Sequence, residues 1–353
     1  MDNGVKSARR VTLSVFIGGH DASSYVDPCL LDFSFTDNAG GKADEVQLTL
    51  HDRDGKWVGP WRPQNGTLIT ASITVHDWEQ AGQLLTLPCG TFKADEIEFS
   101  GPPDKVKIKA VTSALTTGLR DEDKTRAWEN FSLKNLAGQL ATENGLELMY
   151  DGPEHAFARQ DQREESDLGF LQRLASERGM ICKVHDGKLV VYSAVGADAG
   201  QAVVSIPKAG GMYSPTSYSF KESSSKTGYK KAKVAYTDPT SGATHTAEVK
   251  ADDAADDAAD DAGVEDEKTL QLNKRVESSA EAMRLGASEL RDKNKEKNKA
   301  TLEFMGNPAV VAGVVLTLTG FGFFDGRWFV EKAEHKVGTG YKTSVEIRKT
   351  LSY

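Results

Sequence analysis

Few side chains in this sequence combine the residue types and the spacing that a chemical reaction requires. Cys182 and His185 come nearest, because a thiol close to a base is the arrangement of an activated cysteine nucleophile. An odd offset of three on a strand places the two side chains on opposite faces, so no catalytic pair is predicted. Glu164 and Glu165 are neighbouring carboxylates just before a predicted helix, where the helix dipole favours negative charge. A glycosidase would instead need two carboxylates that face each other across a cleft.

Other matches to chemical motifs are partial. Residues 223–226 (SSSK) fit the SxxK pattern of some acyl transferases, but they lie in a serine-rich run without a companion motif. Residues 51–55 (HDRDG) contain part of a calcium loop, but Pro63 stands where that loop needs glutamate. The seven histidines are scattered, and no two have the spacing of metal ligands. The sequence therefore predicts no catalytic residue, no cofactor and no metal site.

The net charge of −9 comes from one segment of the chain. Residues 251–267 hold nine acidic side chains and no basic one, and the remainder of the chain is neutral. A neutral body excludes a broad basic face for nucleic acid or anionic lipid, although it leaves room for a small basic patch. The Asp-Asp-Ala repeat of this segment is too charged and too poor in large apolar groups to pack. We expect a solvated loop that does not bind DNA, because like charges repel.

Cysteines and apolar segments indicate where the protein folds. Cys29, Cys89 and Cys182 are an odd number at wide spacings, which fits neither a disulfide framework nor a zinc site. Reduced thiols, and the lack of a secretory signal in the first fifteen residues, predict folding in a cytoplasm. Residues 304–324 carry no charge, but Pro308, several glycines and many β-branched residues interrupt them. This pattern favours strands joined by turns over a membrane helix.

The chain contains two kinds of secondary-structure pattern, one of strands alone and one of alternating helices and strands. Short runs of alternating apolar residues, separated by turn residues, fill residues 8–112 and indicate a β-barrel or sandwich. Two helix-strand units follow, 34 residues apart. Ser132 and Ser166 are suited to the helix N-caps, and Gly145 and Gly179 to the positions that follow the helices. Strands are predicted at 146–150, 180–184 and 188–192, the last two joined by a tight turn.

Strand patterns return from residue 201 to the end of the chain. They cover residues 202–206, 212–220, 229–236, 244–249, 300–305, 310–319, 328–337 and 342–349. The acidic segment and a helix predicted from Glu277 to about Lys297 interrupt them. The second β region is therefore predicted to contain an insertion. The basic end of its helix offsets the helix dipole and can attract the acidic segment.

Residues 162–192 resemble the motif of the phage late-control gene D family, which comprises baseplate hub proteins of contractile tails and is related to the hub part of type VI secretion spikes. Residues 313–343, with GRWFV at 326–330, are similar to the closing strands of that family. The order of elements also agrees over nearly the whole chain. We expect the motif residues to have a structural role. They are Glu165, Ser166, Asp167, Phe170, Leu171, Arg173, Leu174, Ala175 and Gly179.

The resemblance implies a mainly β fold with α+β insertions, in which two similar antiparallel β-barrel domains accompany a small α/β domain. The first barrel is expected at residues 1–112 and the α/β domain, with its two helix-strand units, at 113–200. The second barrel is expected at 201–249 and 299–353. Residues 250–298 are then an insertion with an acidic low-complexity loop and one helix.

The resemblance also implies a non-enzymatic structural hub. Three two-barrel subunits would present six near-equivalent barrels in a ring and so adapt the sixfold tail tube to the threefold central spike. The implied partners are the other subunits of a homotrimer, tail-tube or tube-initiator proteins, a separate spike protein and other baseplate proteins. No sequence-specific nucleic acid binding and no transmembrane segment are expected. The implied location is the virion tail baseplate, assembled in the host cytoplasm.

A second hypothesis comes from a different functional class. The chain could be an enzyme or a cell-wall-binding module that acts on the bacterial envelope, with Glu164 or Glu165 at a cleft. Peptidoglycan turnover that disappears in a folded E165Q variant would favour this alternative over the structural hub.

Overall fold

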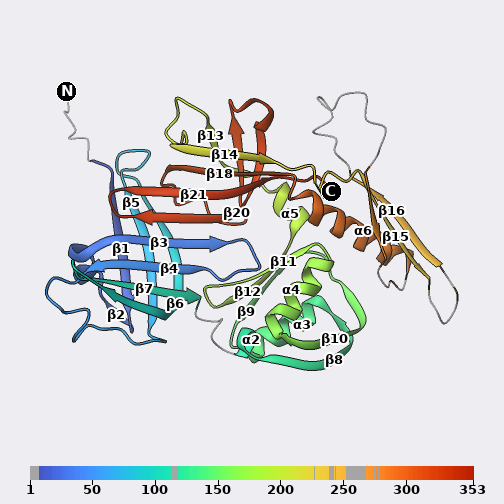
Figure 1. Ribbon diagram of the computed structural model, residues 1–353, viewed down its shortest axis with the longest axis horizontal. Coiled ribbons are helices and arrows are strands. Elements are labelled where there is room, and N and C mark those ends of the chain that lie inside the picture. The colour runs from blue at the N-terminus through green and yellow to red at the C-terminus, as the bar shows by residue number, and fades with distance from the viewer. Residues whose placement is uncertain are drawn as a thin grey trace.

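The computed structural model describes residues 8–112, 118–225, 227–237, 242, 244–251, 268–273, 276 and 278–353 (Figure 1). Strands dominate it, so the prediction of a mainly β chain is confirmed. Figure 1 shows three bodies: an extended sheet, a small α/β unit beside it, and a two-layer wing formed by α6 and its neighbouring strands. The acidic segment from residue 252 to 267 lies outside the described residues.

The N-terminal part of the extended sheet is antiparallel throughout. Alternating burial matches the predicted alternation, since Val46, Leu48 and Leu50 are fully buried while the residues between them are half-buried. A short helix α1 (Ser23–Val26) and a 3-10 turn (Asp27–Cys29) follow the second strand. In spatial order the strands are β2 (His20–Asp21), β1 (Arg10–Ile17), β5 (Leu68–His76), β6 (Leu84–Ser100), β7 (Lys105–Thr112), β4 (Glu45–His51) and β3 (Leu30–Asn38).

The C-terminal part of the same sheet has its own core of large side chains, including Phe304 and Trp328. The uncharged segment 304–324 forms the end of one strand, a loop and another strand, as predicted. None of the helices among the described residues is long and apolar enough to span a membrane. The strands are β20 (Gly326–Val337), β21 (Tyr341–Lys349), β18 (Asn298–Met305) and β14 (Ser217–Glu222), with β19 (Val315–Thr319) beside β20 and β13 (Ala202–Pro207) parallel to β19. A 3-10 turn (Gly322–Phe324) follows β19.

The two parts are joined because β3 pairs with β20. Residues 33–38 of β3 lie antiparallel to residues 332–337 of β20, while the other edge of β3 pairs with β4. Two separate barrels were expected, but the described strands form one continuous sheet of thirteen strands and no closed barrel is found among them. The reason is that hydrogen bonding on both edges of β3 leaves it no free edge with which to close the N-terminal strands alone.

Buried aromatic contacts reinforce the seam between β3 and β20. His335 is fully buried between Phe35 and Tyr341. Its Nε2 lies 3.0 Å from the Val310 carbonyl oxygen, which can only accept, so Nε2 carries the proton and Nδ1 accepts from the Tyr341 hydroxyl at 2.8 Å. Trp78, from the N-terminal part, donates to the Gly306 carbonyl oxygen at 2.6 Å.

The α/β unit contains both predicted helix-strand units. The Ser132 hydroxyl accepts from the Asn135 amide and the Ser166 hydroxyl from the Gly169 amide, both at 3.2 Å, so both predicted N-caps are confirmed. Gly145 and Gly179 follow the two helices with positive φ, as predicted. The elements are α2 (Gly118–Asp121), β8 (Asp123–Ser132), α3 (Leu133–Glu143), β9 (Glu147–Asp151), β10 (Ala156–Ser166), α4 (Asp167–Glu177), β11 (Met180–His185), β12 (Lys188–Ser193) and α5 (Ala194–Ala199).

Two features of this unit were not predicted. Strands β8 and β10 form a separate antiparallel ribbon, although their sequences are largely charged and polar. Strands β11, β12 and β9 form a three-stranded sheet in which β12 and β9 run parallel. Helices α3 and α4 contribute Leu136, Leu140, Leu171 and Leu174 to the core between these layers.

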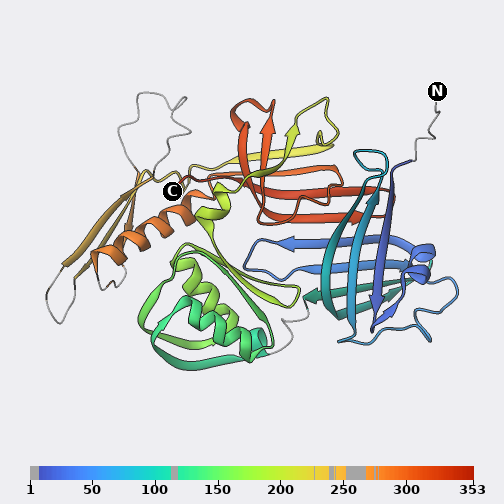
Figure 2. The same cartoon turned by 180° about the vertical axis from the view of Figure 1, so that it is seen from behind.

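The wing is a small sheet covered by one helix (Figure 2). Strands β15 (Lys231–Thr237), β16 (Thr244–Lys250) and β17 (Thr269–Leu272) pair in the order β16-β15-β17, and α6 (Ser279–Asn294) packs on them through Ala282, Leu285 and Leu290. Residues 201–249 were expected in the second barrel, but β15 and β16 pair within the wing. They do so because Ala232 and Val234 of β15 are buried against α6.

Candidate functional site: buried polar contacts

The motif residues lie where the β8–β10 ribbon meets α4 (Figure 1). Gln162 on β10 and Asp167, the first residue of α4, are both fully buried. A buried carboxylate requires partners that neutralise it and satisfy its oxygens. The partners of Asp167 therefore indicate whether the motif residues hold the fold together or form a chemical site.

Asp167 is held by three side chains. The Lys124 ammonium lies 2.6 Å from Oδ2, and Arg126 from the same strand donates to Oδ1. Gln162 donates from Nε2 to Oδ1 at 2.9 Å. Burial raises the pKa of Asp167, but the hydrogen bonds from Lys124, Gln162 and Arg126 outweigh it, so the net pKa is lowered and the carboxylate is charged.

Gln162 links this carboxylate to the ribbon and to the bulge that leads into α4. Its Oε1 accepts from Arg126 Nε and from Trp128 Nε1, both at 3.2 Å. Its Nε2 also donates to the Glu165 carbonyl oxygen at 2.9 Å, beside the register shift between Gln162 and Glu165. Every polar atom of the amide thus has a partner within the protein. Such a satisfied network fixes the geometry of the ribbon and leaves no group for a ligand.

The remaining motif residues serve the same junction. Arg173 Nη2 lies 2.7 Å from Glu165 Oε1 and also donates to the Asp161 carbonyl oxygen at 3.3 Å. Glu164 is exposed and has positive φ, and the structure does not place it opposite Glu165 across a cleft. The apolar motif residues are fully buried in the core of the α/β unit. They are Phe170, Leu171, Leu174 and Ala175.

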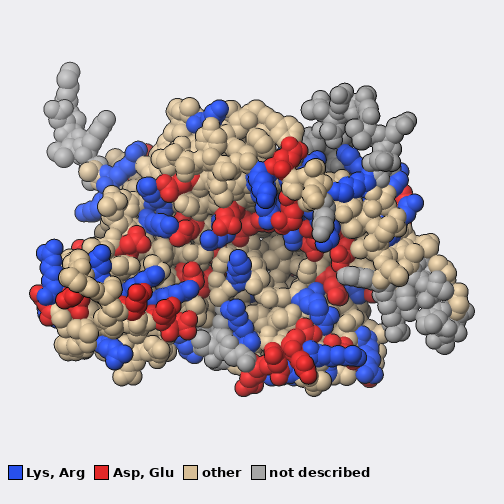
Figure 3. Space-filling view, viewed as in Figure 1, with Lys and Arg blue, Asp and Glu red and all other residues tan. Residues whose placement is uncertain are grey.

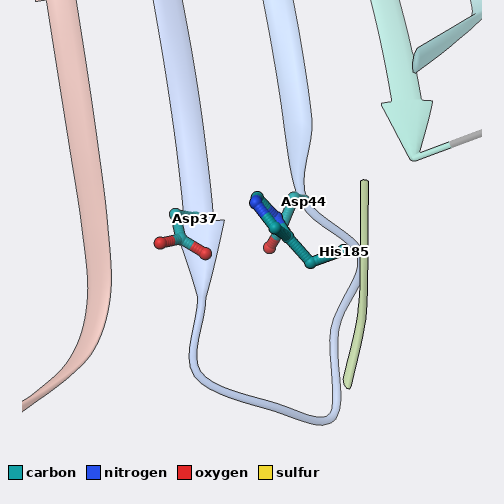
Figure 4. Close-up of side chains that lie close together, drawn as sticks. All are labelled: Asp37, Asp44 and His185. Carbon is teal, nitrogen blue, oxygen red and sulfur yellow. The ribbon is translucent and has the colours of Figure 1, made fainter. Parts of the chain in front are cut away.

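A second polar cluster joins the α/β unit to the extended sheet. Asp37 and Asp44 flank the β3–β4 loop, and His185 comes from the end of β11 (Figure 4). One oxygen or nitrogen from each of these residues lies within 4.8 Å of the others, a spacing compatible with a metal site. The sequence contained no indication of a metal site, because no two histidines have the spacing of metal ligands. In the structure the two carboxylates and the imidazole come together from separate parts of the chain.

The partners of these carboxylates argue for an ion-pair joint. Lys183 Nζ lies 2.6 Å from Asp37 Oδ1 and 3.6 Å from Asp44 Oδ2, so one ammonium already lies close to both carboxylates. Asp37 Oδ2 accepts from the Ala312 amide and Asp44 Oδ1 from the Asn38 amide, and His185 Nδ1 lies at Asp44 Oδ2, each at 2.8 Å. Burial raises the pKa of Asp37, and the nearby Lys183 offsets only part of this, so the net pKa is above its ordinary value. We conclude that Lys183 occupies the position that a cation would take.

Cys182 and His185 lie on opposite faces of β11, as predicted. Cys182 is buried in the core of the α/β unit, whereas Lys183 and His185 point toward Asp44. Burial raises the pKa of the Cys182 thiol to about 12, so it is protonated and unreactive at neutral pH.

A third buried cluster joins all three bodies. Asp198 on α5 accepts from Arg291 of α6 and from Arg348 of β21, and all three side chains are almost fully buried. The Leu351 amide donates to Asp198 Oδ2 at 3.1 Å, which fastens the C-terminal residues as well. Burial lowers the pKa of Arg291 despite the nearby carboxylate. The cluster around Asp37 and Asp44 and the cluster around Asp198 therefore hold the α/β unit, the extended sheet and the wing together.

Comparison with known proteins identifies the family of this chain. Residues 107–341 match the family model described as phage tail baseplate hub (GPD), which covers about two thirds of the chain. The chain belongs to the phage tail baseplate hub family. The match includes the whole Gln162–Gly179 motif, so the sequence resemblance is confirmed.

Relatives of this hub family member come from two phages. The chain is 32% identical over 198 residues to the probable baseplate hub protein of Escherichia phage P2, which is 55% of this chain and 47% of the relative. It is also 32% identical over 180 residues to the probable baseplate hub protein of Escherichia phage 186, which is 50% of this chain and 44% of the relative. The matches thus span about half the length of these curated relatives.

Solved structures of tail proteins share the fold of this hub family member. The 43 kDa tail protein of prophage MuSo2 from Shewanella oneidensis has a TM-score of 0.70 at 15% identity, with 96% of this chain and 98% of that chain covered. The tail protein from Neisseria meningitidis MC58 has a TM-score of 0.68 at 12% identity, with 96% of both chains covered. At such low identity these similarities establish the fold only.

Sequence reasoning located the motif of this hub family member. It missed the two buried polar clusters that join the bodies, one around Asp37 and Asp44 and the other around Asp198. Asp37, Asp44 and Asp198 carry no local signal, because their partners are distant in the chain. The sequence of β11 did contain one indication of a polar contact. Lys183 and His185 alternate there with buried apolar residues, although the strand has no clear solvent face.

Proposed function

We propose that this chain is a structural subunit of the hub of a contractile phage tail baseplate and that it performs no catalysis. The observation that carries the proposal is the family match across residues 107–341, which includes both the motif and most of the second β region. The buried networks around Asp167 and Asp198 support it. Both bind protein groups to one another, as a rigid load-transmitting subunit requires.

We further propose that the two β regions act as two barrel-like units of similar shape. Each has its own apolar core, and the shared strand pairing of β3 and β20 fixes their relative orientation. The units are residues 1–112, and residues 201–230 together with 298–353. The α/β domain comprises residues 113–200, and the wing is the insertion. Three such subunits would offer six similar units and so adapt a sixfold tube to a threefold spike.

The proposed partners are the other two subunits of a homotrimer, tail-tube or tube-initiator proteins, a separate central spike protein and other baseplate proteins. The proposed location is the tail baseplate of the virion, with assembly in the host cytoplasm. A component of the Escherichia coli type VI secretion system shares the fold at a TM-score of 0.53 and 10% identity, with 96% of this chain and 76% of that chain covered. This likeness supports a role common to contractile injection machines.

The alternative of an envelope-acting enzyme finds no favourable geometry. Glu165 is paired with Arg173 at 2.7 Å, and Glu164 is exposed on the ribbon. Glu165 instead supports the motif through its ion pair with Arg173.

The oligomeric state tests the proposal. We expect native mass spectrometry of the purified chain, alone or mixed with its central spike protein, to record a trimer. A species that remains monomeric both alone and with the spike protein would overturn the proposed hub. Peptidoglycan turnover by the wild type that is lost in a folded E165Q variant would overturn the non-enzymatic part of the proposal.

A further inference from the structure

An open groove lies between the β8–β10 ribbon and the wing. Its volume is about 1190 Å³, above the range of about 300–1,000 Å³ for pockets that enclose a small molecule. Six consecutive residues of β10, from Ala156 to Asp161, line one wall, and Arg284 and Leu285 of α6 line the other. Figure 3 shows Lys and Arg beside Asp and Glu over the ribbon, at the lower right. A groove that follows a strand for six residues fits an extended chain segment.

The edge of β10 that does not face β8 is unpaired. Strand β10 pairs with β8 alone, and the Leu133 amide donates to the His155 carbonyl oxygen at 2.8 Å in the register of that ladder. Hydrogen-bonded pairs alternate along an antiparallel ladder, so the backbone groups of Ala156, Ala158 and Gln160 point away from β8. Among the described residues, no hydrogen bond from another element reaches these groups. Strand β10 therefore offers donors and acceptors to which another strand can add.

The side chains along the groove leave one arginine without a counter-charge. Arg159 and Arg163 both pair with Asp161, at 3.2 and 2.8 Å. Arg284 is exposed, and no carboxylate pairs with it in the part of the chain that the structure describes. The charged lining residues are four arginines, Arg159, Arg163, Arg178 and Arg284, and three acids, Asp161, Glu177 and Glu281.

Two buried side chains beside the groove have nitrogen atoms without a partner. Arg178 pairs with Glu281 at 2.7 Å and its guanidinium carbon lies 4.7 Å from the Phe157 ring centre, but its Nε has no acceptor. The side chain of Arg178 is only 8% exposed. His155 is also 8% exposed, and its Nε2 has no partner. Burial lowers the pKa of His155, and the positive charges of Arg178 and Arg284 lower it further. This end of the groove therefore favours a negatively charged ligand.

We propose that the groove binds an extended acidic segment of a partner protein, which adds to the free edge of β10 and places a carboxylate beside Arg178 and Arg284. The backbone edge binds an extended chain of any sequence, and the guanidinium groups select an acidic one. This inference does not depend on the proposed trimeric hub, because it concerns only the α/β unit and the wing of one chain.

Peptide binding to the full chain tests the proposal. The probe is a fluorescent eight-residue peptide in which threonine and glutamate alternate. One control peptide carries lysine in place of glutamate, and the other is methylated on every backbone nitrogen. We expect the acidic peptide to bind at least tenfold more tightly than either control, and added salt to weaken it because exposed charges are screened.

Hydrogen exchange measured by mass spectrometry shows whether a strand is added. Bound acidic peptide should slow amide exchange across residues 156–160, because their outward N–H groups become hydrogen-bonded. Equal binding of the acidic and the methylated peptide would overturn the proposal. So would displacement of the peptide by inorganic phosphate without any change in amide exchange, since the groove would then be a simple anion site.

Matched variants locate the two parts of the contact. R284Q should weaken the acidic peptide about fivefold, because one exposed ion pair contributes modestly. R53Q, which removes an exposed arginine from the turn after β4, should bind as the wild type does. A158P removes one outward N–H at a strand edge, where proline is tolerated, and should weaken binding about tenfold, whereas A158V keeps that N–H and the affinity. Circular dichroism confirms that each variant is folded. Equal affinities of R284Q and R53Q would overturn the assigned role of Arg284.

The native mass separates a partner protein from a second copy of this chain. We expect A158P and R284Q to keep the native mass of the wild type, because the groove receives a different protein. A lower native mass of A158P beside an unchanged mass of A158V would show that another copy occupies the groove. That result would overturn the proposed partner.

Discussion

Arg348 meets Asp198 with both terminal nitrogens, Nη1 at 2.9 Å from Oδ2 and Nη2 at 2.9 Å from Oδ1. This ion pair links the C-terminal strand β21 to α5, the connection between the α/β unit and the second β region. Arg291 of the wing adds a second guanidinium to the same carboxylate. A single buried acid thus fixes the mutual orientation of three bodies.

Replacing this acid should loosen all three bodies. We expect D198N to lower the free energy of unfolding by about 3 kcal/mol, because two buried guanidinium groups lose their counter-charge. Urea unfolding followed by tryptophan fluorescence measures the change. D95N, at an exposed position, is the control and should stay within about 0.5 kcal/mol of the wild type. Equal stability of D198N and the control would contradict the assigned role.

Replacing Asp167 should likewise lower the stability of the α/β unit. D167N leaves the Lys124 and Arg126 charges without their partner, so we expect a loss of about 3 kcal/mol. The lowered pKa of Asp167 adds a pH dependence of known sign. Its contribution is present above the ordinary value of 3.8 and is lost as the pH falls through the lowered pKa. The control is D123N, at an exposed position of β8, the strand that carries Lys124 and Arg126. It should change neither the free energy of unfolding nor its dependence on pH.

His335 should make the seam between β3 and β20 sensitive to acid. Burial lowers its pKa from 6.5 to about 4, so the unfolded chain takes up a proton at a pH where the folded chain does not. We expect stability to fall by about 3 kcal/mol between pH 6.5 and 4 from this group alone. Denaturant unfolding at several pH values measures how steeply the free energy of unfolding falls as the pH is lowered. This dependence should be weaker for H335Q than for the wild type. H20Q, which removes an exposed histidine, should keep the wild-type slope.

Lys183 should be essential to the joint between the α/β unit and the sheet. K183M leaves Asp37 and Asp44 buried without a cation, and we expect a loss of about 3 kcal/mol. K188M removes an exposed lysine that pairs with Glu147 at 3.4 Å, and its effect should be below about 1 kcal/mol. Thermal melting of the wild type should not respond to added Mg²⁺, Mn²⁺ or Zn²⁺. A metal-dependent rise in the melting temperature would contradict the ion-pair assignment.

The acidic segment should be dispensable for assembly. We expect deletion of residues 252–261 to leave the trimer of the proposed hub intact, because the flanking strands β16 and β17 pair with β15 without it. Native mass spectrometry of the deletion variant and the wild type compares the two directly. A monomeric deletion product beside a trimeric wild type would contradict this expectation.

Local signals in the sequence predicted the elements that depend on neighbours in the chain. Both helix N-caps and both helix-ending glycines lie within a few residues of the groups they satisfy, and the structure confirms all four. The β8–β10 ribbon was missed because its charged residues alternate without an apolar face. The joints were missed for a different reason. Lys183 and Asp37 are 146 residues apart, and no periodicity along the chain encodes such a contact.

The pairing of β3 with β20 has a consequence for synthesis on the ribosome. Asp37 lies opposite Ala333, and nearly three hundred residues separate them. At about 5–20 residues per second, the ribosome takes roughly 15 to 60 seconds to supply the partner of β3. During that interval one edge of β3 is open to strands of neighbouring nascent chains. The N-terminal strands therefore complete their hydrogen bonding only after the ribosome has synthesised β20.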